Sequence, residues 1–175
     1  AGSAAQAAAA IMENSIPTAL EPPAFSLQCP LHIGNLERFV VALPSSSFHV
    51  TYVIDYEAEP IGTQILDYEG TPEDYLKKIA PARTFAMAED IEVLRAQGLA
   101  LGGSLDNAIL VEEKQVQTTG GLRFPDEFVR HKMLDLIGDL AVLGRPVKAH
   151  VVAVRAGHVQ HLQLVERLRA LVREV

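Results

Sequence analysis

The amino-acid sequence predicts an α+β fold, in which a layer of helices packs on a sheet. Extended segments rich in β-branched and aromatic residues fill the first part of the chain, and the later part alternates between helical and extended patterns. Its 175 residues, of which 49% are hydrophobic, are enough to build one core without disulfides or a structural metal. These observations favour a single layered α+β sandwich.

The first part of the chain is expected to be mostly extended after an Ala-rich, helical start at residues 1–10. Cys29 is the only cysteine, which excludes an internal disulfide, and we expect it to be a small core residue in the first strand. The candidate strands here are residues 25–33, 39–43, 48–56 and 64–68.

Helix signals begin at Thr71, an N-cap residue followed by Pro72 at the first helical position, and this helix should end near residue 79. The other expected elements are a helix at 88–97, a hairpin of 108–111 with 114–117, a helix at 127–143, a strand at 148–155 and a helix at 157–175. The last helix should bury a stripe of Leu162, Val165, Leu168 and Val172.

Charge and hydropathy exclude several classes of protein. The formal net charge of −7 argues against general binding to nucleic acid, which needs a basic face. No apolar stretch approaches the roughly 20 residues that a membrane span requires. We therefore expect a cytoplasmic protein with neither a nucleic-acid partner nor a membrane span.

The expected helix at 127–143 carries the first candidate site. With about 100° between successive residues, His131, Asp135 and Asp139 fall within about 80° of one another, away from the apolar face. An imidazole and a carboxylate one turn apart can hold a divalent ion. The same spacing is also typical of a solvated His–Asp pair on a polar face, and the spacing alone favours that simpler interpretation.

His158 is the second candidate. It follows Gly157, where an expected strand runs into the N-terminus of the last helix. A histidine in that place can act as an acid or a base, or can stabilise an oxyanion. It can equally be an ordinary first residue of a helix.

Several motifs give the sequence a specific resemblance. They are Ala-Arg-Thr-Phe at 82–85, the Gly-rich segment 97–107, Gly-Leu-Arg-Phe at 121–124, the helical segment 128–139 and Gly-His at 157–158, with a weaker match at 54–64. Together they resemble the bacterial zinc-dependent UDP-3-O-acyl-N-acetylglucosamine deacetylases of lipid A biosynthesis. The resemblance extends from about residue 25 to the end of the chain.

The resemblance implies a two-layer sandwich of helices on a mainly antiparallel sheet, the second of two similar domains. Residues 1–22 would then be a remnant of the first domain with a linker, and 23–175 the C-terminal deacetylase domain. Within it, a β-α-β insert at about 86–118 would form a passage for the acyl chain. The first domain, expected upstream, would supply one further zinc-ligand histidine and a glutamate that acts as the general base.

The resemblance also implies roles for individual residues. His131 and Asp135 correspond to zinc ligands, His158 to an acid/base residue, Asp139 to the carboxylate that orients it, and Thr84 to a hydroxyl near the oxyanion. The residues that correspond to substrate contacts are Lys132 (phosphate), Tyr56 (uracil), Phe85 (sugar), and Met87, Ile91, Ala100, Gly103 and Leu105 (acyl chain).

Three hypotheses follow. The first is that the chain is the C-terminal half of an enzyme that hydrolyses the N-acetyl group of a UDP-linked acyl amino sugar, and that these residues alone are inactive. The second is a non-catalytic substrate-binding or assembly domain, inactive without a first-domain partner. The third is that His32, His49 or His161 completes the zinc site within the chain.

Overall fold

The central element of the fold is a mixed, mainly antiparallel sheet. The computed structural model describes residues 4–16, 23–57, 60–96, 98 and 102–173. The sheet has the strand order β2-β3-β9-β4-β5, with β1 beside β9, and only the β1–β9 and β4–β9 pairs are parallel. Its strands are β1 (Phe25–Ser26), β2 (Leu31–Gly34), β3 (Phe39–Pro44), β4 (His49–Asp55), β5 (Thr63–Tyr68) and β9 (Val147–Val154).

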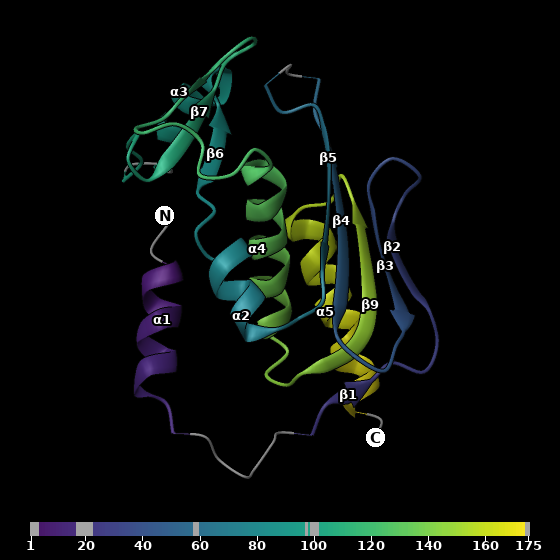
Figure 1. The fold of residues 1–175 in the computed structure, drawn as a ribbon. Helices are drawn as coiled ribbons and strands as arrows, with labels where there is room; N and C mark the ends of the chain where they lie inside the picture. Colours follow the sequence, from purple (N-terminus) through teal and green to yellow (C-terminus); the bar gives the residue numbers. More distant parts are fainter. Residues whose placement is uncertain (1–3, 17–22, 58–59, 97, 99–101, 174–175) are drawn as a thin grey trace.

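Two long helices, α4 (Glu127–Ala141) and α5 (His158–Arg173), cover one face of this sheet (Figure 1). The sheet side chains that point toward them, such as Val40, Tyr52 and Val151, are fully buried, whereas their neighbours along each strand are partly exposed. Helices on one face of a mainly antiparallel sheet form the predicted α+β two-layer sandwich.

Two shorter helical segments lie on the outer side of α4. α1 (Ala4–Asn14) has no buried residue and touches the π-helical turn Tyr75–Ile79, which continues α2 (Pro72–Asp74). The N-cap of α2 is Thr71, whose side chain accepts a hydrogen bond from the backbone of Asp74, as the sequence predicts. Among the described residues, no helix is both long and apolar enough to cross a bilayer.

A separate three-stranded sheet lies at the N-terminal end of α4 (Figure 1). Its strands are β6 (Thr84–Met87), β7 (Ala108–Val111) and β8 (Val116–Gln117), and a 3₁₀ turn (Ala88–Asp90) and α3 (Ile91–Ala96) follow β6 in the chain. β6 and β7 are parallel, so this segment is the β-α-β insert that the resemblance implies. It is called the insert below. Ala100, one of the expected acyl-chain contacts, lies outside the described residues.

Two local predictions are wrong. The expected strand 25–33 is divided, because β1 pairs with β9 while β2 pairs with β3, and Pro30 has no N–H to continue a ladder. Cys29 therefore lies between the two strands and is exposed rather than in the core.

The buried stripe of α5 agrees with the prediction at Val165 and Leu168 but not at Leu162. Leu162 is 43% exposed, and the buried side chains are those of His161, Leu164, Val165 and Leu168. The side chain of Val172 lies outside the described part of the chain. The stripe thus includes a histidine, which a purely apolar pattern does not anticipate.

Candidate active site

Seven of the predicted site residues line one small pocket. β4 and β9 are parallel and end at the same edge of the sheet, so Tyr56, just after β4, and His158, at the start of α5, lie close together. The pocket has a volume of about 320 Å³ and is lined by Tyr56, Thr84, Phe85, His131, Lys132, Asp135 and His158. It therefore joins side chains from the sheet edge, the insert, α4 and α5.

His131 and Asp135 face each other across one turn of α4. His131 Nε2 lies 3.4 Å from Asp135 Oδ1, and both side chains are 15% exposed. His131 Nδ1 is 3.5 Å from the carbonyl oxygen of Ala82, which leaves Nε2 as the nitrogen directed at the carboxylate of Asp135. Burial lowers the pKa of His131, so the neutral imidazole, the form that binds metals, predominates at pH 7.

Both oxygens of Asp135 meet polar groups of the pocket. Lys132 Nζ donates to Asp135 Oδ2 at 2.8 Å, and His158 Nε2 lies 3.8 Å from the same oxygen. Lys132 is 14% exposed, so its ammonium group is held at the pocket wall rather than in bulk solvent. The pocket thus combines a neutral imidazole, a carboxylate and a fixed cation.

His158 and Asp139 are paired, as the resemblance implies. His158 Nδ1 lies 2.7 Å from Asp139 Oδ2, which directs Nε2 toward the pocket, and the His158 side chain is 61% exposed. The same Asp139 oxygen also accepts from His161 Nδ1 at 2.8 Å. His161 is fully buried. The sequence does not predict its contact with Asp139, because residue 161 has the pattern of an ordinary residue of an amphipathic helix.

Two groups of side chains could hold a metal ion, and they are not equivalent. Donor atoms of Asp139, His158 and His161 lie within 4.8 Å of one another. However, both imidazoles direct Nδ1 at the same carboxylate oxygen of Asp139, which is a hydrogen-bond acceptor, so these nitrogens are donors and have no free lone pair. The donor atoms of His131 and Asp135 line the pocket instead, and they are the better candidates for metal ligands.

The other histidines considered as ligands lie elsewhere. His32 and His49 belong to sheet positions that alternate with the buried ones, so they lie on the face opposite α4. His49 stacks on His150 with 4.1 Å between ring centroids and pairs with Asp67 at 3.6 Å. These contacts give no support to a zinc site completed within the chain.

Phe85 forms an aromatic wall of the pocket. Its ring makes edge-to-face contacts with Phe128, Tyr56 and His131, with centroid distances of 5.1, 5.7 and 6.2 Å. Thr84, the preceding residue, is the first residue of β6 and also lines the pocket. The insert thus contributes a hydroxyl and an aromatic face beside His131 and Asp135.

A larger cleft of about 1470 Å³ adjoins the pocket between the insert and the start of α5. Tyr56, Lys132 and His158 line both, and Met87 and Arg155 line the cleft. Ile91 is partly exposed, and Gly103 and Leu105 are exposed; none of the three lines either cavity. The structure therefore brings Met87 to the site and does not bring these three.

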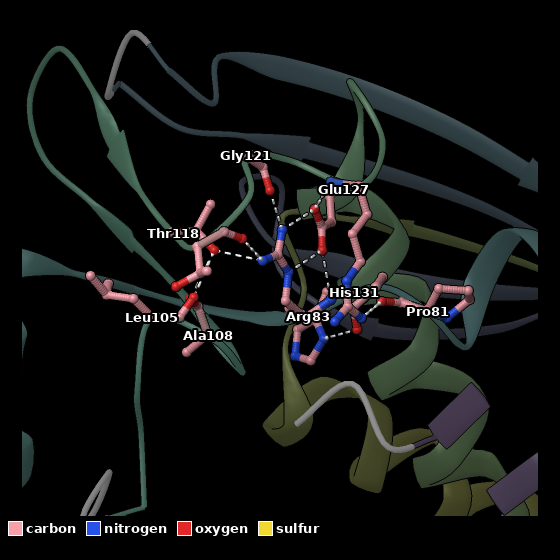
Figure 2. A network of polar contacts seen from close by, with 11 residues as sticks. Pro81, Arg83, Leu105, Ala108, Thr118, Gly121, Glu127 and His131 are labelled. Carbon is pink, nitrogen blue, oxygen red and sulfur yellow. Dashed lines mark hydrogen bonds and ion pairs between the residues drawn. The ribbon is translucent and has the colours of Figure 1, made fainter. Parts of the chain in front are cut away.

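A buried ion pair joins the insert to α4 (Figure 2). Arg83 and Glu127 are 2% and 0% exposed, and Arg83 Nε and Nη2 donate to Glu127 Oε1 and Oε2 at 2.9 and 3.0 Å. The carboxylate also accepts from the backbone N–H groups of Arg83 and Arg123. The remaining guanidinium N–H groups donate to Thr118 Oγ1 at 2.6 Å, Thr119 O at 3.3 Å and Gly121 O at 2.7 Å.

Every N–H donor of the Arg83 guanidinium therefore has an acceptor. Although burial raises the pKa of Glu127, the hydrogen bonds from Arg83 and Arg123 hold it below the ordinary value, so the carboxylate is ionised. The sequence does not predict this pair, because its two members are 44 positions apart and charged residues are usually exposed. The pair fixes Thr84 relative to His131.

Comparison with known proteins shows which chains this one is similar to. A family model described as LpxC, UDP-3-O-acyl N-acetylglycosamine deacetylase, matches residues 1–170. The UDP-3-O-acyl-N-acetylglucosamine deacetylase of Synechocystis is 48% identical over 139 residues, which are 79% of this chain and 50% of the relative. The deacetylase of Syntrophus aciditrophicus is 42% identical over 139 residues, 79% of this chain and 44% of the relative.

The deacetylase of Chlamydia felis is 42% identical over 143 residues, which are 81% of this chain and 51% of the relative. The chain thus spans about half the length of the curated relatives it matches. The family match over residues 1–170 and these identities show that the chain belongs to the UDP-3-O-acyl-N-acetylglucosamine deacetylase family.

Proposed function

We propose that residues 23–175 form the C-terminal domain of a zinc-dependent deacetylase, with 1–22 as the end of the first domain and a linker. The enzyme would hydrolyse the N-acetyl group of a UDP-linked acyl amino sugar. The observation that carries this proposal is the pocket shared by Thr84, His131, Asp135 and His158. The half-length match to the deacetylases supports the view that a second half completes the site.

The donor set suits zinc. Zn²⁺ in catalytic sites takes three protein ligands from His, Asp, Glu or Cys and keeps one position open. His131 is neutral and is oriented by the contact of Nδ1 with the carbonyl oxygen of Ala82, and the carboxylate of Asp135 lies beside it, so these two residues are available as ligands. An N-terminal domain would supply the third ligand, a histidine, and the glutamate general base. Zinc with an open position supplies polarisation of an amide carbonyl and activation of a water.

The other side chains of the pocket have complementary roles. His158, held by Asp139 through Nδ1, presents Nε2 to the pocket and would protonate the leaving amine from that atom. The hydroxyl of Thr84 would donate to the oxyanion. These groups are held by the sheet edge, the insert and α5, so little reorganisation is needed when substrate binds.

The cleft beside the pocket suits an extended, anionic substrate. Lys132 would contact a phosphate, Tyr56 the uracil and Phe85 the sugar. Met87 would begin the passage for the acyl chain, which would continue past Ile91, Gly103 and Leu105 in the insert. Bulk charge would oppose an anionic substrate, so Lys132 and Arg155 in the cleft provide the local attraction.

Acetate release from UDP-3-O-acyl-N-acetylglucosamine tests this function. The N-terminal half of the Synechocystis relative is joined to this chain, and the joined protein is assayed with zinc beside the chain alone. We expect acetate release from the joined protein and none from the chain alone, because the pocket, in the part of the chain that the structure describes, offers two of the three zinc ligands. Bound zinc is counted in the same samples.

His131→Ala in the joined protein should remove both bound zinc and activity. His32→Ala is the matched control, since it removes a histidine from the opposite face of the sheet and should leave both unchanged. An inactive joined protein, measured beside an active whole Synechocystis relative, would count against the proposal. Equal activity of the chain alone would refute the division of the site between two domains.

A further inference from the structure

His161 lies behind the proposed acid/base pair, at the centre of a buried hydrogen-bonded line. Its Nδ1 is 2.8 Å from Asp139 Oδ2, and its Nε2 is 3.0 Å from the hydroxyl of Tyr52 on β4. His161 and Tyr52 are both fully buried, and their rings meet edge to face at 5.9 Å. A histidine in such a place is restricted to a single orientation.

The chemistry of these contacts fixes the proton on the ring. Asp139 is acceptor-only when ionised, so His161 Nδ1 must donate to it. A neutral imidazole then has its lone pair on Nε2, which faces the hydroxyl of Tyr52. That hydroxyl also lies 2.8 Å from the carbonyl oxygen of Ala156, so its one proton serves either of two acceptors.

The last contact of this hydrogen-bonded chain is with the backbone just before His158. Ala156 lies two residues before His158, and its carbonyl oxygen is the one that the Tyr52 hydroxyl contacts. His161 lies one turn after His158 on α5 and shares the Asp139 oxygen with it. Tyr52 and His161 therefore hold His158 from two directions, through the carboxylate and through the turn that precedes the helix.

We propose that His161 is a positioning residue, which holds Asp139, and through it the imidazole of His158, in the orientation for proton transfer. This proposal rests on the proposed deacetylase function. The charged and titratable groups around His161 are Asp139 and Lys132 on α4, His158 on α5 and Tyr52 on β4. His161 itself is fully buried and does not line the pocket, so it does not touch substrate.

The protonation of the ring is measured on the 175-residue chain by imidazole ¹⁵N–¹H correlation NMR at pH 7. We expect a protonated Nδ1 on His161, protected from exchange, and its loss of protection when Asp139→Ala removes the acceptor. A His161 ring with unprotonated Nδ1 would overturn the proposal. This measurement does not depend on zinc, on substrate or on a second domain.

Two amide variants of His161 distinguish a role in positioning Asp139 from a role in packing alone. In His161→Asn the side-chain amide nitrogen occupies the position of Nδ1 and can still donate to Asp139. In His161→Gln the amide nitrogen occupies the position of Nε2, so the donor to Asp139 is lost. In the joined protein, we expect His161→Gln to lower kcat about 10- to 100-fold with KM within twofold, and His161→Asn to restore kcat to within a few-fold of the unmodified protein. Both variants lose the imidazole and should lose similar thermal stability.

Equal kcat losses in the two variants, in proportion to their melting temperatures, would assign His161 a merely structural role. If the unmodified joined protein releases no acetate, the proposed function fails, and the NMR result alone decides whether His161 holds Asp139. A protonated Nδ1 together with kcat rescue by asparagine is the combination that supports the inference.

Discussion

Arg83 and Glu127 form a doubly hydrogen-bonded, buried ion pair at the junction between the insert and α4. Glu127 is four residues before His131, Asp135 is four residues after it, and Asp139 follows by four more, so all four lie along one face of α4. Arg83 fixes this face at its N-terminal end, and His161 fixes it at Asp139. His131 and Asp135, the proposed zinc ligands, therefore lie on α4 between these two buried contacts.

Removing one partner of the Arg83–Glu127 pair should strongly destabilise the chain. Arg83→Met leaves an ionised carboxylate buried without its main donor, which costs about 3–5 kcal/mol. The double variant Arg83→Met/Glu127→Leu should recover part of this loss, because no unpaired charge remains. The free energy of unfolding in urea, measured for each variant, checks both statements.

The matched control for that prediction is the exposed pair Lys78–Asp74, at 2.9 Å on the surface. Lys78→Met should change the free energy of unfolding by less than about 1 kcal/mol, because exposed pairs contribute little. An Arg83→Met variant as stable as Lys78→Met would contradict the role given to the buried pair.

The sequence predicts the parts of the site that depend on local periodicity. The spacing of His131 and Asp135 places them on one helical face, and Gly157 before His158 predicts the start of α5. The convergence of Thr84 and Tyr56 on the same pocket depends on strand pairing over long distances, and it was accessible only through the family resemblance. Periodicity carries no information of that kind.

The buried polar groups are the parts that the sequence does not predict. His161 occupies a position on the apolar stripe of α5, and only the packing of Asp139 and Tyr52 around it explains a histidine there. Arg83 is buried because acceptors from the loop 118–121 and from Glu127 of α4 surround it, and no local pattern signals this. Both are satisfied by partners distant in sequence.

The buried His161 should make stability depend on pH between about 4 and 6.5. Burial lowers its pKa from 6.5 to about 4 in the folded chain, so the unfolded chain takes up the proton first as the pH falls. The stabilisation is complete above pH 6.5 and is lost progressively toward pH 4, up to an amount on the order of 3 kcal/mol. Urea unfolding at several pH values measures it.

His161→Asn supplies the reference for that experiment, since it lacks the titrating ring while carboxylates elsewhere titrate as before. The difference in unfolding free energy between the unmodified chain and this variant should shrink as the pH falls. A difference that stays constant from pH 7 to pH 4.5 would show that His161 keeps its proton state on unfolding.

Arg155, at the turn from β9 into α5, has a left-handed backbone with φ of 47°. Side chains with a Cβ are disfavoured there by roughly 1–2 kcal/mol, and glycine is not. Arg155→Gly should therefore be more stable than Arg155→Ala by about 1 kcal/mol in urea unfolding. At Lys148, an exposed position within β9, the order should reverse. The same order at both positions would contradict the strained turn.

Lys132 and Arg130 are cations two positions apart on α4 with different surroundings, so their variants distinguish an effect on substrate binding from an effect on stability. Lys132 lines the pocket and the cleft, whereas Arg130 donates to Asp126 and to the carbonyl oxygen of Lys78. In the joined protein, Lys132→Met should raise KM about 10- to 100-fold, the usual effect of losing a hydrogen bond to a charged group. Arg130→Met should leave KM within twofold and lower the free energy of unfolding by about 1 kcal/mol. Steady-state kinetics and urea unfolding of both variants test this, and an equal rise of KM in the two would mean that the cations act through bulk charge alone.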